Sequence, residues 1–230
     1  MPATFTSPFA QTLREHAKKP WEDCYRHPFV QELGAGTLRR EAFCFYLRQD
    51  YVYLLEYAKV FALGATKARS ERTMANFTAT QHAILHTELE LHRGYMKEFG
   101  ISLEEAEATT PSLFNRAYTS NMLAVAQAGD TAEILAVILP CAWSYYDYAV
   151  RLAEECTGPI EGNFFRSWID SYAGEEYRSS IAWLFEEIEM ESLKKSAAEH
   201  ERLAEIFHTS MEFEYLFWEM SYKEQMSYSY

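Results

Sequence analysis

The hydrophobic residues of the chain recur mainly at intervals of three and four, which is the spacing of one face of an α-helix. No stretch shows the strict alternation of a β-strand. The pattern predicts helices over residues 7–19, 40–66, 70–99, 111–128, 131–156, 175–193 and 197–224, with shorter ones at 27–36, from 102, and ending near 172. We therefore expect an all-α antiparallel helical bundle forming a single domain over 1–230.

Composition agrees with this prediction. Hydrophobic residues make up 48% of the 230 residues, and 16 Tyr and 15 Phe supply material for a large core. Only 9 Gly and 7 Pro are present, so turns are few and elements are long. Few turns argue against a sandwich or barrel of short strands.

The net charge of the chain limits the classes of partner that it can bind. The formal net charge is −13 and no basic patch stands out, so neither a nucleic acid nor an anionic membrane surface is expected to bind. No apolar run resembles a signal peptide or reaches the roughly 18 residues of a membrane span, which predicts a cytoplasmic protein. Four cysteines without a CxxC pair indicate neither a zinc knuckle nor a disulfide framework.

Two carboxylates interrupt otherwise apolar helix faces. Asp50 lies among Tyr and Leu residues at helical spacing, and Glu214 lies between Met211 and Phe217 on another face. A buried carboxylate has to be paired or hydrogen-bonded. Asp50 is equally compatible with a structural role, satisfied by a Tyr hydroxyl or an Arg, and Glu214 with a partly exposed edge. With no obvious buried cation, the two together suggest a pocket for a ligand that donates hydrogen bonds.

Cys141 lies on a third apolar face, with Tyr145 one turn later. Periodicity alone favours a small buried hydrophobe. Pro140 cannot donate to the preceding turn, and if the helix breaks there, Cys141 lies near a new helix N-terminus, where a thiolate is stabilised. Taken alone, Tyr118 and Tyr172 are more typical of packing than of chemistry.

A metal site is an alternative that the sequence leaves open. Five candidate ligands crowd one predicted helix, namely His82, His86, Glu88, Glu90 and His92. Di-iron bundles use Glu-x-x-His pairs from two helices. Here the segment reads Glu88-x-x-x-His92, and no second candidate pair is found on another helix. A largely solvated face with one or two buried members is the favoured interpretation, with no metal and no cofactor.

Eight segments, taken in order, resemble thiaminase II, the TenA family. They are His27-Pro28-Phe29-Val30-Gln31, Tyr46-Leu47-Arg48-Gln49-Asp50-Tyr51-Val52-Tyr53, Phe61-Ala62-Leu63-Gly64, Leu91-His92-Arg93, Ala117-Tyr118-Thr119-Ser120, Ile138-Leu139-Pro140-Cys141, Trp168-Ile169-Asp170-Ser171-Tyr172 and Phe213-Glu214-Tyr215-Leu216-Phe217-Trp218. The resemblance implies a haem-oxygenase-like fold without haem and usually a homotetramer. It also implies hydrolysis of 4-amino-5-aminomethyl-2-methylpyrimidine to the hydroxymethyl form in thiamin salvage, with cleavage of thiamin by many members.

The resemblance also implies roles for individual residues. Asp50 matches the carboxylate that holds the pyrimidine ring nitrogen and 4-amino group, Cys141 the nucleophile, and Glu214 the acid/base. The aromatic positions that line the pocket are matched by Tyr53, Tyr118, Tyr145 and Tyr172. His86 stands where some relatives carry an acidic residue, and no role is carried over to it.

Two other functions stay open at this point. A non-catalytic pyrimidine-binding or regulatory protein of the same fold would share Asp50 and the aromatic walls, although Cys141 and Glu214 together argue against it. A metal oxidase on a related bundle would use the histidine-rich helix. The sequence does not rank thiamin against its breakdown products.

Overall fold

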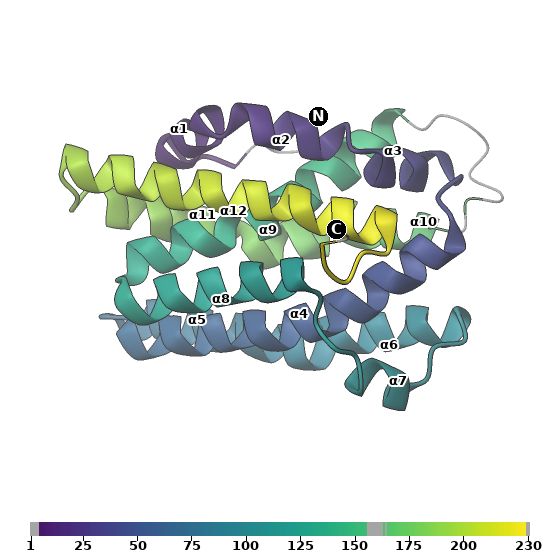
Figure 1. The fold of residues 1–230 in the computed structure, drawn as a ribbon. Coiled ribbons are helices and arrows are strands. Elements are labelled where there is room, and N and C mark those ends of the chain that lie inside the picture. Colours follow the sequence, from purple (N-terminus) through teal and green to yellow (C-terminus); the bar gives the residue numbers. More distant parts are fainter. Residues whose placement is uncertain (1–4, 156–162, 164, 229–230) are drawn as a thin grey trace. The chain divides into compact units, whose positions relative to one another are not determined.

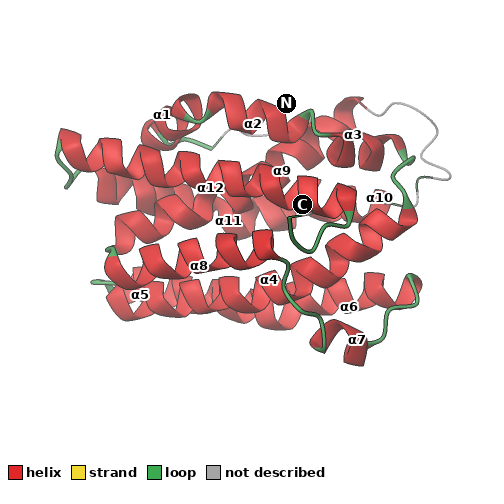
Figure 2. Ribbon diagram, viewed as in Figure 1, coloured by secondary structure: helices red, strands yellow, loops and turns green. Residues whose placement is uncertain are grey.

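The computed structural model describes residues 5–155, 163 and 165–228, and within these ranges it contains helices and no strand (Figure 2). The all-α prediction is confirmed. In chain order the helices are α1 Pro8–His16, α2 Lys18–Tyr25, α3 Pro28–Ala35, α4 Arg40–Lys67, α5 Glu71–Ala83, the π-helix η1 Ile84–Glu88, α6 Leu89–Glu98, α7 Leu103–Glu107, α8 Leu113–Ala128, α9 Thr131–Glu155, α10 Arg166–Ala173, α11 Glu175–Ser192 and α12 Ala197–Lys223.

Contacts divide the chain into two compact units, and each unit is built from two separate stretches. Unit 1 comprises Met1–Leu38 and Thr131–Tyr215, and unit 2 comprises Arg39–Asp130 and Leu216–Tyr230. The boundary near Tyr215 falls inside α12, so that helix contributes to both units. The prediction of a single domain over 1–230 stays a prediction.

Unit 1 is organised around α9, which contacts α3, α10 and α11, while α1 packs on α11 (Figure 1). Its core is rich in large aromatic side chains. The ring of Trp21 lies 5.1 Å from Trp143 and is stacked at 6.3 Å on Phe207, centroid to centroid. Such pairs bury wide apolar surfaces and fix how the helices meet.

Unit 2 is organised around α4, which lies beside α5 and also contacts α6, α7 and α8 (Figure 1). Gly64 of α4 faces the ring of Phe77 on α5 so closely that a Cβ there would overlap the ring. The last part of α12 joins this unit through Trp218, whose ring stacks 5.7 Å from that of Tyr46. The helices of this unit therefore pack closely around α4.

The structure differs from the sequence-based expectation at three helix boundaries. The predicted helix over 7–19 is two helices that meet at Ala17, and the second continues to Tyr25. The predicted helix over 70–99 contains the π-helical turn η1. The helix predicted to open at Thr110-Pro111 begins at Leu113, because the side chain of Ser112 accepts from the Asn115 amide and caps it. The predicted break at 158–159 lies outside the described residues.

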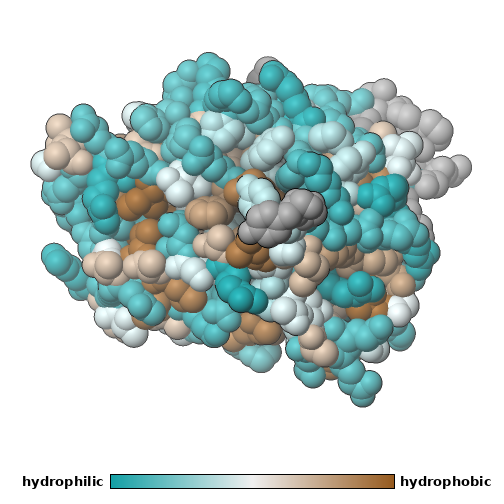
Figure 3. All heavy atoms as spheres, in the orientation of Figure 1, coloured by the Kyte–Doolittle hydropathy of each residue, from teal (hydrophilic) through white to brown (hydrophobic). Residues whose placement is uncertain are grey.

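The face drawn in Figure 3 is mostly hydrophilic, with apolar side chains in small groups, as expected for a chain with net charge −13. Within the described ranges, no helix is both long enough and apolar enough to span a bilayer.

Candidate functional site

Asp50 is buried in unit 2, with 3% of its surface exposed, and its two hydrogen bonds end on the same oxygen. The Tyr46 hydroxyl, one turn earlier on α4, donates to Asp50 Oδ2 at 3.2 Å. The Nε2 atom of His92 on α6 lies 2.5 Å from the same oxygen. The Tyr partner matches one expectation from the sequence, and His92 is a second buried partner of Asp50 that the sequence analysis did not assign to it.

His92 is the functional candidate that sequence reasoning passed over as one of five possible metal ligands. Its side chain is 2% exposed, and its Nδ1 atom faces the backbone carbonyl of Glu88 at 3.0 Å. Burial by itself would lower the pKa of His92, but the neighbouring Asp50 charge and the hydrogen bonds to Asp50 and Glu88 outweigh it, so the pKa is raised. The sequence offered one usable signal, a carboxylate on an apolar face that needs a buried partner, but it did not identify His92 as that partner.

The π-helix η1 lies immediately before the helix that carries His92. The Leu89 amide bonds to the Ile84 carbonyl five residues back, which inserts a wide turn between α5 and α6. Single π-turns of this kind are enriched at functional sites because they change the phase of the following helix. Here the following turn presents His92 to α4, with its ring bonded to the carbonyl of the last η1 residue.

Tyr53 and Tyr118 form the aromatic part of the same unit. Their ring centroids are 5.2 Å apart, and Tyr53 also stacks on Tyr57 at 5.4 Å. Phe217 meets Tyr53 edge-on at 5.4 Å. Tyr53 lies one turn beyond Asp50 on α4, so a flat aromatic surface begins next to the carboxylate.

Cys141 lies in unit 1, half-buried on α9. The helix does not break before it: α9 continues through the buried Pro140 from Thr131 to Glu155. Pro140 has no backbone N–H, so the helix lacks one hydrogen bond at this position. The Pro140 side chain is nevertheless buried, and the helix is continuous on both sides of it. Stabilisation of a Cys141 thiolate by a new helix N-terminus is therefore excluded.

Tyr145 and Tyr172 come together next to this stretch of α9. Their rings are 5.0 Å apart, and Trp168 of α10 lies 5.7 Å from Tyr145 and 4.8 Å from Tyr172. Tyr145 is one helical turn beyond Cys141, so the thiol and this aromatic cluster share a face of α9. Trp168 was not among the predicted site residues, although it opens the segment that ends at Tyr172.

Glu214 is buried on the unit 1 part of α12, with 2% of its surface exposed, so the alternative of a partly exposed edge residue is wrong. Burial raises the pKa of the Cys24 thiol and of the Tyr148 phenol, and the charge of Glu214 raises both further. The Tyr148 hydroxyl donates to the Trp21 carbonyl at 2.7 Å. Glu214 thus lies in a largely apolar core region where a proton-transfer group would be shielded from water.

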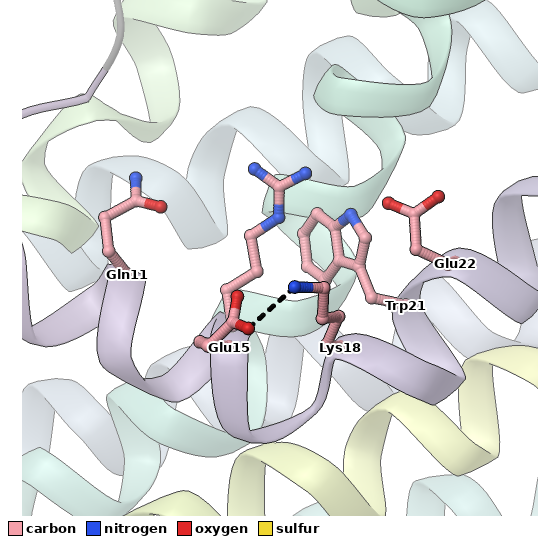
Figure 4. A pocket seen from close by; sticks show the side chains of 6 residues that line it. Gln11, Glu15, Lys18, Trp21 and Glu22 are labelled. Atoms are coloured by element: carbon pink, nitrogen blue, oxygen red, sulfur yellow. Dashed lines mark hydrogen bonds and ion pairs between the residues drawn. The ribbon is translucent and has the colours of Figure 1, made fainter.

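A hollow of about 140 Å³ on α1 and α2 does not coincide with any predicted site residue (Figure 4). Its rim carries an exposed ion pair between Lys18 and Glu15 at 2.7 Å, and Trp21 lines it. The guanidinium of Arg14 lies 4.7 Å from the Trp21 ring centroid. These solvated opposite charges form a surface feature and supply no chemistry for a pyrimidine.

The histidine-rich helix shows no metal-type cluster. The exposed rings of His82 and His86 lie 4.3 Å apart, while His92 is turned toward Asp50. Within the described ranges, no group of three or more His, Cys, Asp or Glu side chains is placed to share a metal ion. His82, His86 and Glu90 are exposed and His92 is buried, as expected for a largely solvated face with a buried member.

Comparison with known proteins extends the resemblance seen in the sequence. The model of the TENA/THI-4/PQQC family matches residues 14–224. The chain belongs to this family. An aminopyrimidine aminohydrolase of Halalkalibacterium halodurans is 43% identical over 95% of this chain and 97% of the relative. One from Helicobacter pylori is 42% identical over 93% of this chain and 98% of the relative.

Solved structures agree on the fold. A TenA family structure from Silicibacter sp. TM1040, described as a transcription regulator, superimposes with a TM-score of 0.88 at 32% identity, covering 95% of this chain and 98% of that one. A Shewanella denitrificans domain described as having a heme oxygenase-like fold gives a TM-score of 0.71 at 13% identity, over 94% and 92% of the two chains. The predicted family and fold are both confirmed.

Proposed function

We propose that this protein is an aminopyrimidine aminohydrolase of thiamin salvage. It replaces the amine of 4-amino-5-aminomethyl-2-methylpyrimidine with a hydroxyl group, and thiamin is the second substrate to test. The observation that carries the proposal is the 43% identity, over 95% of the chain, to a relative with that name. In keeping with the family, we further propose a cytoplasmic homotetramer that binds no nucleic acid and needs no cofactor.

In the proposed reaction, Asp50 accepts hydrogen bonds from the substrate and orients it. An aminopyrimidine is flat and carries amino donors, which suits a carboxylate beside an aromatic surface. Tyr53 and Tyr118 supply such a surface in unit 2, with centroids 5.2 Å apart, and Tyr145 and Tyr172 supply one in unit 1, 5.0 Å apart.

Cys141 is proposed as the nucleophile. Its thiolate adds to a ring carbon, and the ring electrons shift onto a ring nitrogen that takes up a proton. The exocyclic C–N bond then breaks, and ammonia leaves after its nitrogen is protonated. Water adds to the exocyclic carbon, the S–C bond breaks, and the ring nitrogen gives up its proton. The net change is one water consumed and one ammonia released.

Glu214 is proposed as the group that moves these protons. Its 2% exposure keeps bulk water away from the carboxyl group, which favours a role as acid in one half of the reaction and as base in the other. A Glu214→Gln variant keeps the shape but cannot exchange protons. We expect binding to persist and turnover to fall by roughly 100-fold or more, the usual range for loss of a general acid–base.

The test is a substrate panel read by mass spectrometry, comparing thiamin, the aminomethyl pyrimidine and its formylated precursor. Cys141→Ala and Cys141→Ser should abolish turnover with unchanged melting temperature, whereas Cys44→Ala, at another half-buried thiol, should keep it. Full activity of Cys141→Ala would overturn the covalent mechanism. Failure of the unmodified protein to hydrolyse any of the three compounds would overturn the proposed function itself.

A further inference from the structure

The environment of His92 decides how many protons the Asp50–His92 pair holds. Nδ1 faces the Glu88 backbone carbonyl at 3.0 Å, and a carbonyl only accepts, so Nδ1 carries a hydrogen. A neutral imidazole has one such hydrogen, which would leave Nε2 bare against Asp50 Oδ2 at 2.5 Å. Two bare acceptors at that distance repel each other. A proton therefore lies between the two atoms, and the raised pKa of His92 favours its place on the ring, as an imidazolium facing a carboxylate.

Both protein donors of Asp50 end on one oxygen. Tyr46 and His92 each bond to Oδ2, while Oδ1 has no hydrogen-bond donor within the part of the chain that the structure describes. A carboxylate oxygen has about two acceptor positions, so Oδ2 is filled by the protein and Oδ1 is left for another donor. Oδ1 is not among the fully buried atoms that lack a partner, so this oxygen keeps a small accessible area in a residue that is only 3% exposed.

We propose that His92 is a positioning residue for substrate binding: its imidazolium holds Asp50 by Oδ2 and presents Oδ1 to the amino group of the aminopyrimidine. This inference rests on the proposed function and adds a residue to it. Pairing also leaves the buried Asp50–His92 unit neutral overall, so the site accepts a neutral ring without an uncompensated charge. His92 itself does not touch the substrate in this proposal.

The first arm of the test needs no ligand. Nitrogen-15 NMR of the histidine-labelled protein near pH 7 should show both ring nitrogens of His92 protonated. An Asp50→Asn variant removes the partner charge and should return His92 to a neutral tautomer. A His92 ring in the unmodified protein with one bare nitrogen would overturn the proposal, because Oδ2 would then lack the donor that fixes it.

The second arm measures binding of 4-amino-5-hydroxymethyl-2-methylpyrimidine by calorimetry. We expect His92→Gln to weaken binding roughly 10-fold and His92→Phe more, since loss of a charge-assisted hydrogen bond typically has effects of this order. In the Asp50→Asn background, His92→Gln should change affinity less than about twofold, because His92 acts through Asp50. His82→Gln, at the exposed ring on α5, is the matched control and should bind as the unmodified protein does.

A merely structural role makes a different prediction. It would weaken binding equally in both Asp50 backgrounds, and that additive result would overturn the positioning role while leaving the hydrolase intact. If the unmodified protein neither binds nor hydrolyses the pyrimidine, the proposed function fails and the positioning role fails with it. Should His92→Phe not fold, His92→Gln and the NMR arm decide the question.

Discussion

The contact between Gly64 and Phe77 predicts that even a substitution by alanine near the C-terminal end of α4 destabilises unit 2. A Cβ built at Gly64 lies within 2.8 Å of three ring carbons of Phe77, a fully buried side chain on α5. Carbon atoms in contact normally sit about 3.5–4.0 Å apart. Gly64→Ala therefore requires the ring, or α5 with it, to move by about 1 Å.

Two effects of opposite sign set the magnitude. Replacing Gly by Ala inside a helix stabilises by about 1 kcal/mol. Forcing a methyl group into a filled core costs about 1–3 kcal/mol, and three ring carbons under the contact distance put this case near the upper end. The expected net loss is about 2 kcal/mol, which for a chain of this length corresponds to a melting temperature lowered by about 4–8 °C.

Gly94 on α6 is the matched control for the assay. A Cβ added there meets nothing within 4 Å, so Gly94→Ala keeps the helix gain without the overlap. Thermal unfolding followed by circular dichroism should show the melting temperature rising for Gly94→Ala and falling for Gly64→Ala. Adding Phe77→Leu to Gly64→Ala should destabilise less than the two single effects summed. A Gly64→Ala protein that gains as much stability as Gly94→Ala would refute the packing argument.

Three further outcomes follow from local contacts. The Ser112 hydroxyl caps α8 by accepting a hydrogen bond from the Asn115 amide at 3.0 Å. Ser112→Ala removes this cap and should lower the free energy of unfolding by about 1 kcal/mol in urea titrations. The raised pKa of His92 means that the folded state holds its proton more tightly than the unfolded chain, so this contribution to stability is complete below about pH 6.5 and is lost as pH rises through the higher folded-state value. The gap in melting temperature between the unmodified protein and His92→Gln should therefore shrink from pH 6 to pH 9, and a gap that widens would contradict the assignment. Burial raises the pKa of the Cys24 thiol well above its usual value, so little thiolate is available to react. Brief iodoacetamide treatment, mapped by peptide mass, should label the half-buried Cys44 and spare Cys24. Labelling of Cys24 would contradict this prediction.

The long helices were predictable because their apolar faces repeat over many turns. α4, α9 and α12 begin and end within a residue or two of the predicted positions. Irregularities within the helices were not predictable, since they depend on tertiary contacts. Pro140 lies buried inside α9 although proline usually ends a helix, and the π-turn before α6 has no sequence signature that periodicity can detect.

The candidate site was predictable in part for the same reason. Asp50 and Glu214 stood out as charged residues on apolar faces, and both are buried. Pairing with His92 was not predicted, because 42 residues separate it from Asp50 and its neighbours in the sequence are polar. Periodicity identifies which residue is buried, but the partner depends on which helices meet.

The division of the chain into two interleaved units has a consequence for synthesis on the ribosome. Residues 1–38 belong with 131–215, so the first three helices emerge long before their partners. Unit 1 is complete only 177 residues after Leu38, at Tyr215, and making these residues takes about 9–35 s at 5–20 residues per second. Over the same interval α4 to α8 emerge together as near neighbours in sequence, and such local contacts form early. The nascent chain therefore carries its N-terminal aromatic residues unpaired for many seconds, and this is the period in which a chaperone would have most to do.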